Sequence, residues 1–355
     1  MIARKGLYLW LFHQPTNLTE KQMRKTALLL WACACSAALW AQSPEEKGLA
    51  VINQATAEAH IGFLASDNLE GREAGTREGR VAGDYIAAQL QAMGITPLDG
   101  AYFHPFEAYH LERQKRGARW QVHPDSVEVI RQTNAYQRLD LRNVLGMIEG
   151  KNPNEIVIVG AHYDHLGRDP FLAGDQIYNG ADDNASGVSA VLQIARAFVA
   201  TGQQPERTIV FAFWDGEEKG LLGSKAFVQS FSRMAQVKGY LNFDMIGRNN
   251  DESKPNHVVY FYTEAKPQFG DWLKEEIKTY HLDLAPDYRP WDNPIGGSDN
   301  GSFARVGVPI IWYHTDAHPD YHQPSDHAER INWKKVVEIT KASFLNMWYM
   351  ANRKF

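Results

Sequence analysis

Histidine and carboxylate side chains recur in five short clusters in the middle and last thirds of this chain. They lie at residues 162–165, 182–183, 215–218, 244 and 320–327. Imidazole nitrogens and carboxylate oxygens are ligands of divalent transition metals. A lone carboxylate before a helix is more often a cap or a complement to the helix dipole. Capping explains each cluster separately, but it does not explain why all five occur together.

The composition of the clusters indicates which metal they suit. So many carboxylates in one place would repel one another and raise one another's pKa unless a cation lay among them. A set of histidines and carboxylates without a thiol suits zinc, with manganese or cobalt as alternatives. One carboxylate can bridge two ions about 3.5–4 Å apart, and such pairs polarise a carbonyl group and generate hydroxide near neutral pH. The sequence offers ligands for two ions.

The elements that must position these clusters follow from hydrophobic periodicity. Strands are predicted at residues 121–131, 139–148, 156–159, 208–213, 240–245, 258–262 and 308–313. Helices are predicted at residues 52–65, 77–93, 186–199, 224–231, 267–280 and 332–352. This alternation predicts an α/β fold, a three-layer αβα sandwich around a mixed, largely parallel central sheet. The clusters follow successive strand ends, which is where ligands bind in such sheets.

The clusters belong to five longer motifs that together resemble one known family. The motifs are AHYDH (161–165), GADDNASG (180–187), EEKGLLGS (217–224), FDMIGR (243–248) and YHQPSD (321–326). Their combination is similar to that of peptidase family M28, the secreted zinc aminopeptidases, whose relatives include glutamate carboxypeptidases and glutaminyl cyclases. The resemblance begins at residues 63–76 and extends to the final helix. It implies the zinc-exopeptidase fold.

The resemblance also implies two Zn²⁺ ions and their ligands. Carried over position by position, His162 and Asp244 hold one ion, Glu218 and His322 hold the other, and Asp183 bridges the two. The peptide bond that follows this bridging residue is typically cis in relatives. Its neighbour Asp182 is not expected to be a ligand.

The catalytic roles come from the same resemblance. Glu217 matches the general base that takes a proton from water and later delivers it to the leaving amine. Tyr321 matches the phenol that hydrogen-bonds the developing oxyanion. Asp164 matches the acid that holds the imidazole of residue 162 in its metal-binding tautomer. Three further histidines are expected to serve the scaffold or the substrate rather than a metal: His165, His318 and His327. The family often has Ser-Asp-His where this chain has Ser298, Asp299 and Asn300.

We therefore expect a secreted di-zinc exopeptidase that removes the N-terminal residue from peptides, with a metal-bridging hydroxide activated by Glu217. One alternative on the same fold is a glutamate-type carboxypeptidase, for which Arg248, Arg289 and Arg305 could recognise a substrate carboxylate. A glutaminyl cyclase with a single zinc is another alternative. A metal-free binding protein is the third.

The amino-terminal segment has the pattern of an export signal. Arg24 and Lys25 precede an uncharged apolar stretch at 27–40, which small residues follow. We expect residues 1–22 to be an upstream mis-start, 23–41 a signal peptide and 42–355 a single M28-like domain in the periplasm or the medium. A membrane anchor is the weaker alternative, because spanning takes about 20 residues. A lipid anchor at Cys33 or Cys35 is disfavoured by the bulky residue 31.

The composition of the chain limits which other classes of protein are possible. The chain has 355 residues, 44% of them hydrophobic and 22% charged, which is ordinary for a globular protein. A net charge of −5 gives no electrostatic reason to expect nucleic acid. Both cysteines precede residue 42, so the mature chain would have no disulfide and no thiolate metal site. We expect peptide substrates and no stable membrane insertion after signal cleavage; the sequence does not indicate an oligomeric state. Residues 249–295 are expected to form a pocket wall or a packed cap.

Overall fold

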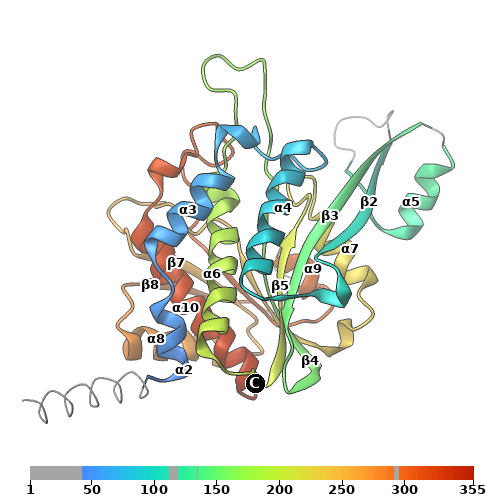
Figure 1. Ribbon diagram of the computed structural model, residues 1–355. Helices are drawn as coiled ribbons and strands as arrows, with labels where there is room; N and C mark the ends of the chain where they lie inside the picture. Colours follow the sequence, from blue (N-terminus) through green and yellow to red (C-terminus); the bar gives the residue numbers. More distant parts are fainter. Residues whose placement is uncertain (1–41, 112–118, 134, 292–295) are drawn as a thin grey trace, which may run out of the picture. The chain divides into compact units, whose positions relative to one another are not determined.

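The computed structural model describes residues 42–111, 119–133, 135–291 and 296–355 (Figure 1). The export signal expected at 23–41 and both cysteines lie outside the described residues. Backbone contacts divide the chain into Met1–Ser43 and Pro44–Phe355, and all described helices and strands belong to the second unit. None of the described helices combines the length and the apolar character that crossing a bilayer requires.

One mixed sheet forms the centre of the second unit. Its strands are β1 (Thr96–Pro97), β2 (Phe103–Leu111), β3 (Tyr136–Ile148), β4 (Asn152–His162), β5 (Arg207–Trp214), β6 (Val237–Phe243), β7 (His257–Tyr262), β8 (Ala285–Pro290) and β9 (Ile310–His314). Their order is β1-β3-β5-β4-β6-β9-β7-β8, and β2 pairs with β3. The four central strands β5, β4, β6 and β9 run parallel, whereas β3 and β7 join this block in antiparallel pairs. The predicted mixed sheet with a parallel centre is confirmed.

Helices cover both faces of the sheet. They are α2 (Pro44–Ala50), α3 (Gln54–Leu64), α4 (Arg77–Ala92), α5 (Pro124–Arg131), α6 (Gly187–Thr201), α7 (Leu222–Ser230), α8 (Gln268–Tyr280), α9 (Asn300–Ala304) and α10 (Trp333–Asn352). In β5, alternate residues belong to opposite cores, because successive side chains of a strand point to opposite faces. Residues 209, 211 and 213 pack with α3, α4, α6, α8 and α10, and residues 210, 212 and 214 pack with α7 and α9. Figure 1 shows α3, α4 and α6 over the nearer face, which completes the three-layer sandwich.

The structure corrects the sequence prediction at residues 121–131. The predicted strand is instead the helix α5, preceded by an isolated bridge between Gln121 and Tyr109. Pro124 suits the first turn of a helix because its missing N–H would have no partner there. The ring of His123 caps this turn by accepting a hydrogen bond from the backbone of residue 125, at 3.3 Å. The alternation of valine and glutamate at 127–129 resembles a strand, but these starting signals prevail. Figure 1 shows α5 beside the ends of β2 and β3 that extend past the other strands.

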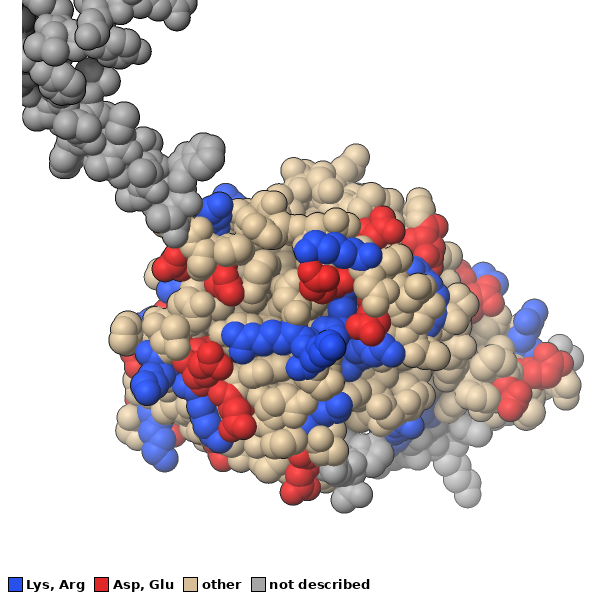
Figure 2. Space-filling model, turned by 90° about the horizontal axis from the view of Figure 1, so that it is seen from below, with Lys and Arg blue, Asp and Glu red and all other residues tan. Residues whose placement is uncertain are grey.

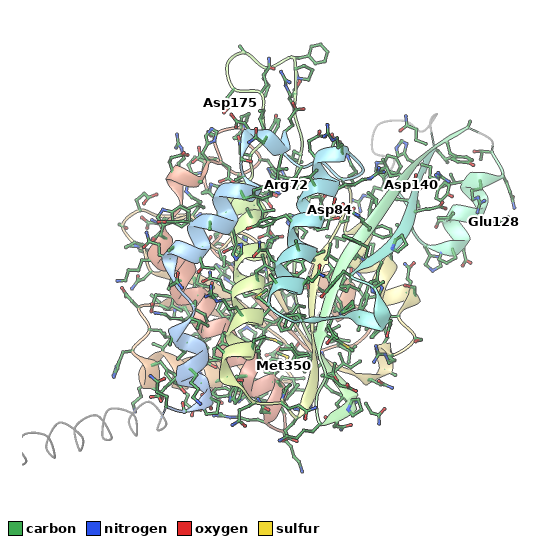
Figure 3. The ribbon with its side chains drawn as sticks, in the orientation of Figure 1. Arg72, Asp84, Glu128, Asp140, Asp175 and Met350 are labelled. Atoms are coloured by element: carbon green, nitrogen blue, oxygen red, sulfur yellow. The ribbon has the colours of Figure 1, made fainter. Side chains whose placement is uncertain are left out.

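The carboxyl ends of the parallel strands meet at one edge of the sheet. Ala161 of β4 is level with Phe213 of β5 and Phe243 of β6, and Phe243 is level with Tyr313 of β9. The loops that follow these strands therefore start side by side. In Figure 3 the labelled Arg72 lies in the upper half of the molecule, and Met350, which packs near the start of β6, lies at the base. Figure 2 shows the molecule from below, that is, from the side where Met350 lies in Figure 3. This side has a band of basic side chains with acidic side chains beside it.

Candidate metal centre

The structure brings together all five side chains that were predicted to hold metal. The Nε2 atom of His162 lies 3.3 Å from Asp183 Oδ1 and 3.6 Å from Asp244 Oδ1. The Nε2 atom of His322 lies 3.2 Å from Asp183 Oδ2 and 3.2 Å from Glu218 Oε2. The two oxygens of Asp183 thus face two different groups. One carboxylate lies between two sets of ligand atoms.

These distances fit divalent metal ions. Ligands about 2.0–2.1 Å from a tetrahedral zinc ion are about 3.3 Å apart, and the four distances between predicted ligand atoms are 3.2–3.6 Å. A charge-assisted hydrogen bond would be shorter, about 2.7–2.9 Å. Asp183 Oδ1 is buried and receives no hydrogen bond from the described residues. A cation on each side of Asp183 would satisfy these oxygens, so the donor set fits a pair of zinc ions.

Neighbouring carboxylates have opposite pKa shifts in this centre. Burial would raise the pKa of Asp183, but its contacts with His162 and His322 hold that pKa well below its ordinary value. Burial raises the pKa of Glu217 well above its ordinary value; the charge of His162 offsets this in part, and nearby Asp244 adds to it. The contacts with these two histidines therefore favour the negatively charged form of Asp183. Burial therefore favours the protonated form of Glu217, so this side chain holds a proton more firmly than an exposed glutamate does.

Local contacts fix the loop that carries Asp183. The residues between β4 and α6 form a π-helical turn at Ala181–Ser186, and the peptide bond from Asp183 to Asn184 is cis. The carboxylate of Asp326 accepts hydrogen bonds from the backbone nitrogens of residues 182 and 183, both at 3.0 Å. The side chain of Asn184 donates to the carbonyl of Phe243 at 2.9 Å. The loop is thereby attached to the end of β6.

A buried arginine supports the same loop from the other side. Arg72 is fully buried, and its hydrogen bonds to the described part of the chain all go to backbone carbonyls, which belong to Leu64, Tyr163, Asn179, Gly180 and Asp183. It therefore joins the end of α3, the end of β4 and the loop before α6. Sequence reasoning did not single out this residue. It lies in the segment at 63–76 that carries part of the family resemblance.

Asp164 contacts both the histidine ligand and the glutamate pair. The Nδ1 atom of His162 lies 3.2 Å from the backbone oxygen of Asp164 and 3.7 Å from its carboxylate. The carboxylate instead accepts hydrogen bonds from the backbone nitrogens of Glu217 at 3.0 Å and Glu218 at 3.3 Å. The carbonyl of Asp164 therefore orients the imidazole, and its side chain orients the loop after β5.

Tyr321 lies where a substrate can reach it. Its side chain is 39% exposed, and its ring stacks on that of His322 with centroids 3.9 Å apart. The buried part of the side chain and the nearby carboxylates raise the pKa of Tyr321 well above its ordinary value, so the phenol keeps its proton. It can donate a hydrogen bond to a bound carbonyl group.

The remaining predicted residues fall in different places. Asp182 accepts hydrogen bonds from Ser186 and Gly247 rather than facing the other ligands. His318 lies 3.2 Å from Asp182, and the ring of His327 makes a hydrogen bond to Asp175 at 2.9 Å, outside the centre. His165, which was not expected to be a metal ligand, lies inside the centre.

Asp299 is a second residue to which the sequence analysis gave no role. Its side chain is buried, and burial raises its pKa to about 7. Its charge is among those that raise the pKa of Glu217.

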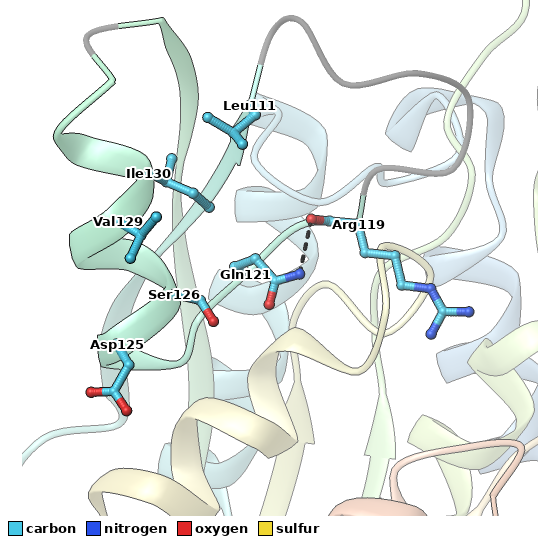
Figure 4. A pocket seen from close by; sticks show the side chains of 7 residues that line it. All are labelled: Leu111, Arg119, Gln121, Asp125, Ser126, Val129 and Ile130. Carbon is cyan, nitrogen blue, oxygen red and sulfur yellow. Dashed lines mark hydrogen bonds between the residues drawn. The ribbon is translucent and has the colours of Figure 1, made fainter.

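A surface hollow of about 390 Å³ lies apart from these residues, between the end of β2 and α5 (Figure 4). It is lined by Leu111, Arg119, Gln121, Asp125, Ser126, Val129 and Ile130. None of the predicted site residues lines it, and in Figure 4 the guanidinium of Arg119 points away from the other six side chains. The chemistry described above does not involve this hollow.

Comparison with known sequences identifies the family. Residues 143–346 match the model of peptidase family M28, which is more than half of the chain. The chain is 32% identical over 170 residues to leupeptin-inactivating enzyme 1 of Streptomyces exfoliatus, covering 47% of this chain and 34% of that protein. It is 35% identical over 161 residues to an aminopeptidase of Pseudomonas aeruginosa, covering 43% of this chain and 26% of that protein. The chain thus matches about a third or less of the length of these relatives.

A solved structure has the same fold. The aminopeptidase LapA of Legionella pneumophila superposes with a TM-score of 0.64 and 21% sequence identity. The superposition covers 87% of this chain and 73% of LapA. At this level of identity the likeness concerns the fold.

Proposed function

The chain belongs to peptidase family M28, and on that premise we propose that it is a two-zinc aminopeptidase that removes the N-terminal residue from peptides. The observation that carries the proposal is the position of Asp183, with one oxygen toward His162 and the other toward His322. This arrangement supports a pair of ions with a shared carboxylate. The name of the Pseudomonas aeruginosa relative supports the substrate class.

The proposed metal ligands form two sets that share one carboxylate: His162, Asp183 and Asp244 in the first, and Asp183, Glu218 and His322 in the second. When bound, zinc would polarise the scissile carbonyl group and lower the pKa of water. The three carboxylates among these ligands would offset most of the charge of the two ions.

Glu217 and Tyr321 perform the proton and charge steps in this proposal. Glu217 accepts a proton from the attacking water as the new C–O bond forms at the scissile carbon. The phenol of Tyr321 donates a hydrogen bond to the carbonyl oxygen while negative charge develops there. As the C–N bond breaks, Glu217 delivers the proton to the leaving amine. The raised pKa of Glu217 supports its keeping the proton between these two steps.

Two of the three arginines considered for a carboxypeptidase already have acidic partners. Arg248 is paired with Asp320 at 2.7 Å, and Arg289 is paired with Asp287 at 2.7 Å. These pairs favour an aminopeptidase over the glutamate-type alternative. The presence of both ligand sets favours a two-metal enzyme over a one-zinc cyclase and over a metal-free binding protein.

The proposal includes export. It rests on the pattern at residues 24–41, outside the described residues. Mass spectrometry of the protein recovered from the periplasm or the medium should show an amino terminus at Gln42, and a chain that retains Met1 in the cytoplasm would contradict it.

The activity is tested with a panel of peptides on the purified chain loaded with zinc. We expect release of the first residue from unblocked peptides, whether or not their carboxyl end is amidated. N-acetylated peptides should not be cleaved. Release of the last residue, cyclisation of N-terminal glutamine, or binding of two zinc ions without any hydrolysis would contradict the proposed function.

A further inference from the structure

His165 lies inside the candidate metal centre, although the family pattern gives it no role there. Its side chain is buried, and its Nδ1 atom lies 2.7 Å from Glu218 Oε1 and 3.9 Å from Asp183 Oδ2. Ligand atoms of these three residues lie within 4.8 Å of one another. Two roles are therefore open to it. It could be another metal ligand, or it could hold one of the ligands in place.

The distance to Glu218 distinguishes these roles. Two ligands of one tetrahedral zinc ion are about 3.3 Å apart, and His322 lies 3.2 Å from both of its carboxylate neighbours. His165 lies 2.7 Å from Glu218 Oε1, which is the length of a charge-assisted hydrogen bond. Its contact is with Oε1, whereas His322 faces Oε2. The two histidines thus use different oxygens of one carboxylate.

We propose that His165 is a positioning residue for the metal ligand Glu218. Its Nδ1–H donates to Oε1 and turns Oε2 toward His322 and Asp183, so that this carboxylate presents one oxygen to a divalent transition metal. This inference rests on the metal-dependent function proposed above. It adds a residue that fixes the geometry of one half of the centre.

The surroundings hold the ring of His165 in this orientation. Its backbone nitrogen donates to the carbonyl of Arg72 at 3.3 Å, and it forms an isolated parallel bridge with Glu73. Residue 180 is a glycine with φ of +59°, and a Cβ there would lie 2.5 Å from Cδ2 of the ring. The Nε2 atom is buried without a hydrogen-bond partner among the described residues. The polar contacts of the ring are therefore those of Nδ1 with the carboxylates.

Loss of such a supporting contact has a known scale. Removing the hydrogen-bond partner of a metal ligand typically weakens metal binding about 10- to 100-fold, because the free ligand becomes less well oriented. The affected set is the one containing Glu218 and His322. The set formed by His162, Asp183 and Asp244 keeps its own contacts.

The experiment measures zinc affinity and stoichiometry of the full chain by competition with a chelator and by elemental analysis. His165→Leu removes the donor at similar volume, and His165→Asn keeps an amide donor near the position of Nδ1. His327→Leu is the matched control, because His327 contacts Asp175 outside the centre. We expect His165→Leu to weaken binding of one zinc equivalent about 10- to 100-fold. His165→Asn should restore most of the affinity, and the control should bind like wild type.

The outcomes separate the possible failures. Wild-type affinity in His165→Leu would overturn the inference, and so would an equal loss in His165→Leu and His165→Asn, which would indicate a direct ligand. Urea unfolding of the chelator-treated proteins separates the effect on zinc affinity from a loss of folding. His165→Leu removes the hydrogen bond of a buried ring and should lower stability, but the chain should stay folded. A variant that is unfolded under the assay conditions, so that unfolding accounts for the lost affinity, would overturn the positioning role. If wild type binds two zinc ions but cleaves no peptide, only the proposed function fails. If it binds none, both fail.

Discussion

Arg72 offers a stringent test of how the candidate centre is held together. Its guanidinium is fully buried and contacts five carbonyl groups from three separate segments. One of these carbonyls, that of Gly180, also accepts a hydrogen bond from Ala185 at 3.3 Å. An uncharged replacement such as Arg72→Leu would leave the other four without the donor they have now.

The loss of folding stability expected in Arg72→Leu follows from these contacts. A buried acceptor without a partner costs about 1–3 kcal/mol, so four cost about 4–12 kcal/mol. This equals most of the stability of a typical domain, about 5–15 kcal/mol, so Arg72→Leu should not fold to the native state. A lysine has three donors on one nitrogen and would leave at least one of the four unpaired. Arg72→Lys should therefore fold and lose at least the cost of one unpaired carbonyl, about 1–3 kcal/mol.

Urea unfolding of the metal-free protein measures this loss directly. Arg77→Lys is the matched control, because Arg77 is exposed at the start of α4. We expect the control to stay within about 0.5 kcal/mol of wild type. If Arg72→Lys unfolds at the same urea concentration as the control, or if Arg72→Leu folds with wild-type stability, the reasoning about the buried carbonyls is refuted.

Three further changes test other parts of the account. Glu217→Gln should retain zinc but lower kcat about 100- to 10,000-fold, because the amide cannot carry the proton; single-turnover peptide hydrolysis measures this, and retained turnover would remove Glu217 from its role. Tyr321→Phe should lower kcat about 100-fold with little change in KM, because its hydrogen bond strengthens only as charge develops; a change confined to KM would contradict that. Burial and the charge of Arg196 lower the pKa of His60 to about 4. Since the unfolded histidine binds its proton near pH 6.5, stability should fall by up to about 3 kcal/mol as pH drops from 6.5 to 4. In His60→Gln, urea titrations should show that this part of the pH dependence is gone; an unchanged dependence would refute the assignment.

The clusters at strand ends indicated where a site would lie, and the resemblance to peptidase family M28 indicated which side chains to propose as ligands. His162 is the last residue of β4 and Asp244 directly follows β6, and these two strands are neighbours in the sheet, so the two side chains lie close together. The predicted general base Glu217 likewise lies just after β5, a neighbour of β4. The position of a residue in the sequence is therefore enough to place it at this edge of the sheet when it lies at the end of a parallel strand.

The supporting residues could not be predicted in the same way. Arg72 contacts backbone carbonyls, which leave no signal in residue types. His165 and Glu218 are 53 residues apart, and their contact depends on how the loop after β4 turns. The helix α5 was missed because Val127 and Val129 alternate with polar neighbours, whereas the proline and the cap at its start decide the local structure.

The central claim is that two divalent ions neutralise the carboxylates around Asp183. Anomalous diffraction at the zinc edge, from crystals of the zinc-loaded chain, tests it most directly. We expect two peaks about 3.5–4 Å apart, one on each side of Asp183. A single peak, peaks that do not touch Asp183, or no peak at saturating zinc would contradict the claim.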